Sequence, residues 1–203
     1  MLNYITLKIK IINSLIHCLS KNIFIGFNIN MDYNITSTSP TNFYGLCKKP
    51  VIVDNKLMRG CAISSPFKLK KMKEEGITQI IDLRNSARIE SPFEKLMCNL
   101  LGIKYQHCNF SHRLNELPSN DFFETINKLI ISNKGKSYVQ CEYGKHRTGL
   151  VVAIYEKLHT QNSDKKIIEN LINNGYKEIT KEGKTNKEKK YIGLYQQMMD
   201  RYF

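Results

Sequence analysis

The sequence predicts an α/β fold, a single-domain sandwich in which a mostly parallel central sheet is flanked by helices. From about residue 42, short apolar segments typical of buried strands alternate with longer segments that carry helix signals. Such alternation favours a parallel sheet, because parallel strands need a crossover connection and that connection is usually a helix. The 203 residues, 41% of them hydrophobic, suit one globular domain with a substantial core.

The expected elements follow one another in a regular order, with cap and turn residues at their boundaries. Ser65-Pro66 and Ser91-Pro92 each place a serine at the N-cap and a proline at the first helical position, which is typical of a helix start. Gly76 ends the first of these helices. Strands are expected at residues 51–53, 57–58, 78–83, 103–107 and 137–140, and helices at 65–76, 91–102, 118–132, 147–159, 163–173 and 186–202.

The chain is strongly basic, with Lys+Arg 31, Asp+Glu 18 and a net charge of +13. The lysines are spread along the chain, and the densest run, 181–190, alternates with Glu182 and Glu188 as in a solvated segment. Nucleic-acid-binding domains instead cluster their cations, so we expect no nucleic acid partner. The charge favours phosphate-bearing substrates. No uninterrupted apolar run approaches about 18 residues, so no membrane span is expected.

Residues 1–40 are expected to form an N-terminal extension and residues 41–203 the main domain. Three lysines interrupt the apolar residues of the first 31 positions, whereas a secretory signal has an unbroken apolar stretch followed by small residues. Two interpretations stay open for this segment. It is either an amphipathic arm or an upstream extension that precedes a true start at Met31.

The six cysteines are scattered and contain no C-x-x-C pair. A domain of this size needs no disulfides, so we expect reduced thiols and a cytoplasmic location. Cys61, Cys98 and Cys108 are interpreted as small buried residues, with a role as resolving thiols as the second possibility. His107, Cys108 and His112 match no standard zinc spacing, so no metal site is expected.

One stretch, residues 139–150, combines the residue types that phosphate chemistry needs. Cys141 is expected at the end of a strand and Arg147 at the start of a helix, with Gly144 allowing a tight turn between them. A loop that leads into a helix N-terminus points N–H groups at a bound anion, and the arginine can hold two phosphate oxygens at once. The same groups favour a thiolate, so Cys141 is predicted to attack phosphorus, with the Thr148 hydroxyl donating to its sulfur. The expected substrate-binding residues are Glu142, Tyr143, Gly144, Lys145, His146 and Arg147.

This stretch resembles the signature loop of the cysteine-dependent protein tyrosine and dual-specificity phosphatases, which reads Cys141-x5-Arg147-Thr148-Gly149 here. The run Gly-Lys-His-Arg-Thr-Gly at 144–149 is most similar to the plant and fungal atypical dual-specificity phosphatases. The resemblance covers residues 42–160 and includes residues 57–60, 76–84, 102–103 and Pro118.

The resemblance implies a dual-specificity phosphatase-like fold, with residues 41–203 as the phosphatase domain. It also implies hydrolysis through a phosphocysteine intermediate on Cys141, without a metal or an organic cofactor. The implied substrate is a phosphorylated protein or an inositol phosphate. We expect the chain to act as a monomer.

Two positions depart from the pattern of this family. Relatives often carry histidine immediately before the nucleophile, where this chain has Gln140. Relatives also carry an aspartate general acid in the loop before the third helix, and that loop contains no aspartate here; Asn109 stands near the expected place, and an amide cannot donate a proton as an acid. The candidate general acids are His112, Glu116 and Asp121, each of which also fits an ordinary exposed or first-turn helix residue.

The missing aspartate leaves the substrate class open. A tyrosine leaving group has a pKa near ~10 and benefits from an acid, whereas the phosphate leaving group of a pyrophosphate needs less help. An inositol polyphosphate or pyrophosphate is therefore the second possible substrate; Lys145 and His146 favour it, and Glu142 argues against it. The sequence is also compatible with a phosphate-binding module without turnover, with a sulfurtransferase-like domain and, more distantly, with hydrolysis of an RNA 5′-triphosphate.

Overall fold

The computed structural model describes residues 49–63, 65–85, 92–110, 116–176 and 186–203. The predicted N-terminal extension, residues 1–40, lies outside this part of the chain, as does the candidate acid His112. The boundary expected between residues 40 and 41 therefore stays a prediction.

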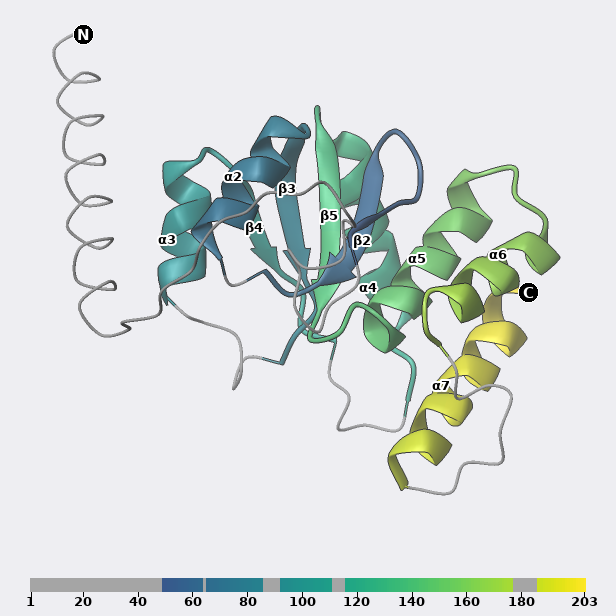
Figure 1. The fold of residues 1–203 in the computed structure, drawn as a ribbon. Coiled ribbons are helices and arrows are strands. Elements are labelled where there is room, and N and C mark those ends of the chain that lie inside the picture. Colours follow the sequence, from purple (N-terminus) through teal and green to yellow (C-terminus); the bar gives the residue numbers. More distant parts are fainter. Residues whose placement is uncertain (1–48, 64, 86–91, 111–115, 177–185) are drawn as a thin grey trace, which may run out of the picture. The chain divides into compact units, whose positions relative to one another are not determined.

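Five strands form one sheet in the order β1-β2-β5-β3-β4 (Figure 1). Their bounds are β1 Val51–Ile52, β2 Leu57–Cys61, β3 Ile77–Asp82, β4 Lys104–His107 and β5 Lys136–Cys141. Of these strands, β1 runs antiparallel to β2, and all the other pairings are parallel. Asp54 closes the β1–β2 turn, because its Oδ1 accepts hydrogen bonds from the N–H groups of Lys56 and Leu57 at 2.8 Å each. The predicted mostly parallel sheet is confirmed.

Helices cover both faces of this sheet (Figure 1). Their bounds are α2 Pro66–Glu74, α3 Pro92–Leu100, α4 Asn120–Ser132, α5 His146–His159, α6 Asp164–Asn173 and α7 Asn186–Tyr202. Successive strand residues enter opposite cores, as alternation along a strand requires: Tyr138 packs with α2 and α3, and Val139 packs with α4 to α7. Burial on both faces explains why β3, inside the sheet, is mostly apolar rather than alternating, whereas the edge strand β4 is polar and at most half-buried.

Helix α5 is the centre of the larger core. Its residues are buried without interruption from Thr148 to Glu156. It packs against α4, α6 and α7 as well as β2 and β5. A helix surrounded in this way is apolar around its whole circumference, which explains the run Leu150 to Ile154. Because α5 follows β5 closely, the connecting loop is held at the edge of the sheet where the parallel strands end, the usual place for a ligand in such folds.

Candidate active site

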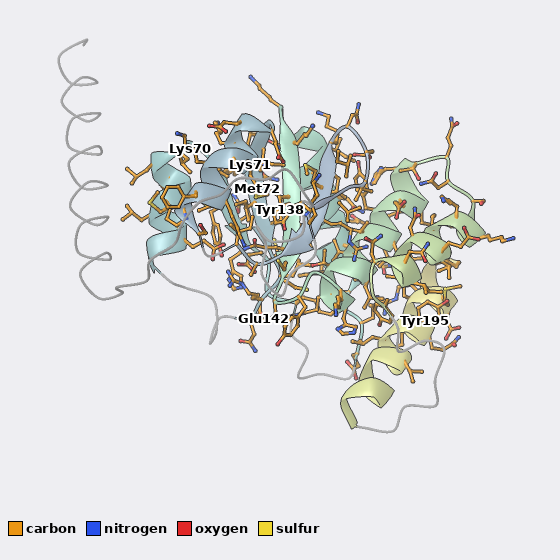
Figure 2. All side chains as sticks on the ribbon, in the orientation of Figure 1. Lys70, Lys71, Met72, Tyr138, Glu142 and Tyr195 are labelled. Carbon is orange, nitrogen blue, oxygen red and sulfur yellow. The ribbon has the colours of Figure 1, made fainter. Side chains whose placement is uncertain are left out.

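The predicted nucleophile, Cys141, is the last residue of β5 and is 3% exposed. It is a free thiol. Residues 142–145 form the loop, and α5 begins at His146. Figure 2 shows Glu142 at the edge of the sheet where β5 ends. The chain therefore passes from strand to helix within four residues, and the helix begins one residue before its predicted start at Arg147.

Gly144 allows this short connection. Its φ of 65° lies in the left-handed region, which favours glycine. A Cβ at this position would overlap the backbone of Gly60 and Cys61 at the end of β2. The loop thus rests directly on β2, and a larger residue would displace it.

No side chain in the described part of the chain closes the N-terminus of α5. It has no side-chain cap and no acidic residue in its first turn. Its first helical bond runs from the Gly149 N–H to the Lys145 carbonyl at 3.0 Å, so the N–H groups of Arg147 and Thr148 have no acceptor within the helix. By contrast, Ser163 caps α6, whose first turn also carries an acid. The positive end of the α5 dipole is therefore available to an external anion.

Arg147 is anchored at one edge of its guanidinium. Its Nη1 donates to the Leu83 carbonyl at 2.9 Å, directly after β3. The Leu83 N–H in turn donates to the Gln140 carbonyl at 2.9 Å, which ties this point to β5. The side chain is half-buried, and its remaining donors have no hydrogen-bond partner among the residues that the structure describes. That edge of the fork can bind phosphate oxygens.

Thr148 is fully buried, and its Oγ1 has no hydrogen-bond partner within the described ranges, Cys141 included. Buried hydroxyl groups are normally hydrogen-bonded. The expected bond from Thr148 to the Cys141 sulfur is thus not formed in this structure. Its unused donor lies in the first turn of α5, close in sequence to the loop.

A buried arginine that we did not assign from the sequence lies behind the loop. Arg59 of β2 is 3% exposed, and its Nη2 donates to the carbonyls of Gly144 at 2.9 Å and Lys145 at 3.4 Å. Burial lowers the pKa of Arg59 to about 10, although the charges of Cys141 and Glu156 oppose this change. The sequence held one indication of this role, because Arg59 is the single charged residue of β2 and arginine is rarely buried without partners.

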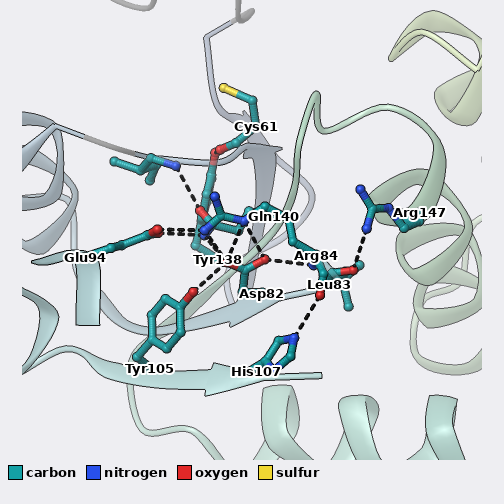
Figure 3. A network of polar contacts seen from close by, with 11 residues as sticks. Cys61, Asp82, Leu83, Arg84, Glu94, Tyr105, His107, Tyr138, Gln140 and Arg147 are labelled. Carbon is teal, nitrogen blue, oxygen red and sulfur yellow. Dashed lines mark hydrogen bonds and ion pairs between the residues drawn. The ribbon is translucent and has the colours of Figure 1, made fainter. Parts of the chain in front are cut away.

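Gln140, which stands where relatives often have histidine, is fully buried beneath the loop (Figure 3). Its Nε2 donates to Asp82 Oδ2 at 3.0 Å and to Glu94 Oε1 at 2.8 Å. Its Oε1 accepts from the Ile63 N–H at 3.2 Å. The amide thus joins β5 to three other segments, and it fixes the residue before Cys141 without being titratable itself.

Arg84 completes this network (Figure 3). Its Nε donates to both carboxylate oxygens of Asp82, at 3.0 and 2.9 Å, and its Nη2 lies 2.6 Å from Glu94 Oε2. Burial raises the pKa of Asp82, but the hydrogen bonds and charge of Arg84 outweigh it and lower that pKa overall. The pKa of Glu94 is raised, mainly by burial. Through these contacts Asp82 and Arg84 tie the end of β3 to α3.

The remaining predicted binding residues form the rim of the loop. Tyr143 is 59% exposed, and Lys145 is exposed as well. The His146 ring packs edge-on against Tyr176, with 5.3 Å between ring centroids. A cavity of about 160 Å³ beside the loop is lined by Lys49, Val51, Arg59, Gly60, Cys61, Tyr143, Gly144, Lys145 and Asn174. None of the described residues that line it carries a carboxylate, so the cavity suits an anionic group.

Two of the candidate acids can be located. Glu116 is exposed, immediately after a segment outside the described residues that contains His112. Asp121 is exposed in the first turn of α4. Neither makes a hydrogen bond or ion pair with residues 141–148 in the part of the chain that the structure covers. The identity of the acid stays a prediction.

The other described cysteines differ from one another. Cys98 and Cys108 are free, and burial raises the pKa of both thiols, that of Cys98 to about 12. Such thiols are poor nucleophiles. Cys61 departs from the expectation of reduced thiols, because it is disulfide-bonded. Within the described ranges, no three His, Cys, Asp or Glu side chains gather as a metal site requires.

Several solved structures, one of a PP-IP phosphatase, share this fold. The core catalytic domain of the S. cerevisiae PP-IP phosphatase SIW14 is 18% identical, with a TM-score of 0.53 over 76% of this chain and 85% of that one. P. aeruginosa TpbA is 11% identical, with a TM-score of 0.52 over 68% and 80%. A Shewanella putrefaciens CN-32 protein provisionally classed as a phosphatase is 15% identical, with a TM-score of 0.56 over 77% and 92%.

The comparison with curated proteins finds no significant match. The comparison with family models finds one, described as a DSP-PTPase phosphatase fused to NAD+ kinase, which covers residues 48–196. This range includes the whole sheet, the loop and α7 as far as residue 196. The chain therefore belongs to this family of dual-specificity-type phosphatases.

Proposed function

We propose that this chain hydrolyses phosphate monoesters through a phosphocysteine intermediate on Cys141. The observation that carries the proposal is the open end of α5 beside that thiol. An uncapped helix N-terminus, the free edge of Arg147 and a buried cysteine meet within seven residues. Together they favour a phosphoryl group placed over sulfur.

In the first step, Cys141 Sγ attacks phosphorus; a P–S bond forms as the P–O bond to the leaving group breaks. The leaving oxygen takes a proton from the general acid, for which His112, Glu116 and Asp121 are the candidates. In the second step, water attacks the phosphocysteine and releases inorganic phosphate and the thiolate. In this proposal the Thr148 hydroxyl, which is buried and has no hydrogen-bond partner among the described residues, donates to the departing sulfur in this step.

Arg147 and the loop hold the three non-bridging oxygens during both steps. Their charge increases in the transition state, so donors arranged in advance accelerate the reaction as well as binding the substrate. The α5 dipole adds a partial positive charge at the same place.

The protein tyrosine or dual-specificity type is the substrate class we propose first, with an inositol polyphosphate or pyrophosphate as the second candidate. The cavity beside the loop favours the second candidate, because its described lining includes Lys49, Arg59 and Lys145 and no carboxylate. No helix in the described part of the chain is long and apolar enough to cross a membrane. The monomeric state and cytoplasmic location stay predictions.

The test compares wild type with Cys141→Ser on an aryl phosphate, a phosphotyrosine peptide and an inositol pyrophosphate. We expect turnover in the wild type and a loss of about a thousandfold or more in the variant. The ratio of kcat/KM values among the three substrates decides the class. Phosphate binding without turnover of any of them would instead indicate a binding module.

A further inference from the structure

We infer that Arg59 is a positioning residue, which holds the loop in its phosphate-binding conformation by binding the carbonyls of Gly144 and Lys145 from behind. This inference rests on the proposed function of the loop. Arg59 lies on β2, outside the signature loop, and we infer that it orients the N–H groups of that loop.

The geometry of the peptide bond carries the first step. A trans peptide is planar, so the C=O of one residue and the N–H of the next point in opposite directions. With the Gly144 and Lys145 carbonyls turned toward Arg59 Nη2, the N–H groups of Lys145 and His146 point away from it. A loop that binds an anion through its backbone requires this orientation.

Gly144 adopts a left-handed φ, which lets its carbonyl point toward Arg59. The same freedom of glycine would also allow the peptide to rotate away again. Glycine restricts the backbone less than any other residue, so a second group must select one orientation of the adjacent peptide. Arg59 provides that selection with a charged donor, and hydrogen bonds to charged groups are stronger than those between neutral groups.

The burial of Arg59 supports a dedicated role. Its side chain makes no ion pair within the described ranges. Glu156 is the carboxyl group whose charge raises the pKa of Arg59, but its Oε1 accepts hydrogen bonds from Asn162 and Asn170, at 3.0 Å each. The cation keeps its charge at neutral pH, because its pKa remains about 10. Among the described residues, its hydrogen bonds go to the loop alone.

Two cavities flank Arg59 and provide a sharp test. One of about 90 Å³ lies toward Glu156 and Asn170, and the other of about 160 Å³ lies toward Tyr143 and Lys145. Truncation to alanine removes a wall that both cavities share. The space that results can admit a guanidinium ion at the place of the lost group.

The experiment measures kcat and KM of Arg59→Ala with and without millimolar guanidinium, and with urea as the neutral molecule of the same shape. We expect kcat to fall about 10- to 100-fold, and guanidinium, but not urea, to restore a substantial part of it. Arg201→Ala is the matched control, since Arg201 also donates to a backbone carbonyl, that of Pro118, but is exposed on α7. It should retain full activity and show no response to guanidinium.

Arg59→Met fills the space without donating, so it separates packing from positioning. Wild-type activity in Arg59→Met or Arg59→Ala, or equal rescue by urea and guanidinium, would overturn the inference. If Arg59→Ala fails to fold, Arg59→Met is used in its place, and folded Arg59→Met with normal kcat has the same consequence.

A binding measurement keeps this test separate from that of the proposed function. In the Cys141→Ser background, calorimetry with inorganic phosphate measures the affinity of the loop for phosphate in the absence of turnover. We expect weaker binding on Arg59→Ala and recovery with guanidinium. If the wild type binds phosphate but hydrolyses no substrate, the proposed function fails. The phosphate affinity of Arg59→Ala, with and without guanidinium, still decides the role of Arg59.

Discussion

The guanidinium of Arg147 donates to the carbonyl oxygen of Leu83 at 2.9 Å, which joins the first turn of α5 to the end of β3. This contact crosses 64 positions of the sequence. It holds one edge of the guanidinium in place and leaves the other for a ligand. The signature arginine is thus oriented by a strand end that the signature itself does not contain.

Replacing Arg147 by lysine should therefore reduce activity although the charge is kept. A lysine ammonium cannot both bind the Leu83 carbonyl and present two parallel donors to phosphate. We expect kcat/KM for an aryl phosphate to fall about a hundredfold or more, with unchanged folding by circular dichroism. Arg201→Lys is the control and should match the wild type. An Arg147→Lys enzyme within about threefold of wild type would contradict the two-edged role of this side chain.

Thr148→Val should change stability and activity in opposite directions. The substitution removes a buried hydroxyl that has no partner among the described residues, so we expect stability to rise by about 1 kcal/mol. We expect kcat to fall about 10- to 100-fold, because the departing sulfur loses its donor. Thermal melting and steady-state kinetics measure both effects. Loss of stability would show that the hydroxyl has a partner in solution.

Thr160→Val is the matched control for this pair of effects. The Thr160 hydroxyl donates to the Glu156 carbonyl at 2.7 Å and accepts from the Asn162 N–H at 3.3 Å. Its removal should lower stability by about 1 kcal/mol and leave kcat unchanged.

Gln140→Leu should destabilise the fold strongly. It removes the donor shared by Asp82 and Glu94 and leaves both buried carboxyl groups with one hydrogen bond fewer. We expect urea denaturation to show a loss of about 2 to 4 kcal/mol. Gln196→Leu removes an exposed amide bonded to Asp200 at 2.8 Å and should change stability by less than about 0.5 kcal/mol. Similar values for both variants would mean that the buried network contributes little.

Gly144→Ala should disable the loop. The added Cβ meets the backbone of β2, and alanine disfavours the left-handed φ by about 1 kcal/mol or more. We expect reduced stability and a large loss of kcat, because the loop must move away from the backbone of β2. Gly193→Ala is the control, since Gly193 lies in α7 and no atom of the described residues lies within 4 Å of its added Cβ. That variant should gain about 0.5 to 1 kcal/mol.

The stability of the chain in acid should depend on Asp82. Despite burial, Arg84 holds the pKa of Asp82 below its ordinary value of 3.8, so the folded chain binds this proton more weakly than the unfolded chain. The resulting stabilisation is complete above pH 3.8 and is lost as pH falls through the lower folded value. Urea unfolding between about pH 4 and pH 2.5 should show a shallower pH dependence for Asp82→Asn than for wild type. Equal slopes would exclude this linkage.

Much of this molecule could be predicted without coordinates. The serine–proline pairs located the starts of α2 and α3 within a residue, because an N-cap and a first-turn proline act locally. The strand from 78 to 83 was recognisable because a sheet buried on both faces requires a continuous apolar run. The loop could be predicted because its chemistry is contiguous: strand end, glycine, arginine and helix start lie within nine residues.

The groups that support the loop could not be predicted in the same way. Arg59 meets Gly144 across 85 positions, and Gln140 meets Glu94 across 46. Each pairing depends on which elements become neighbours in the fold, and local sequence patterns do not predict the order of strands in a sheet. The departure at Gln140 was visible as an exchange of residue type, but its three partners were not.

The sequence by itself determined the alternation of strands and helices and the residues of the phosphate loop, because propensity, capping and backbone turns act over a few residues. Only the tertiary structure decided which side chains stand behind that loop. The sheet order β1-β2-β5-β3-β4 places β2 and β3 on either side of β5. Arg59 from one neighbour and Leu83, just after the other, can therefore reach the loop from opposite sides and set the direction of its donors.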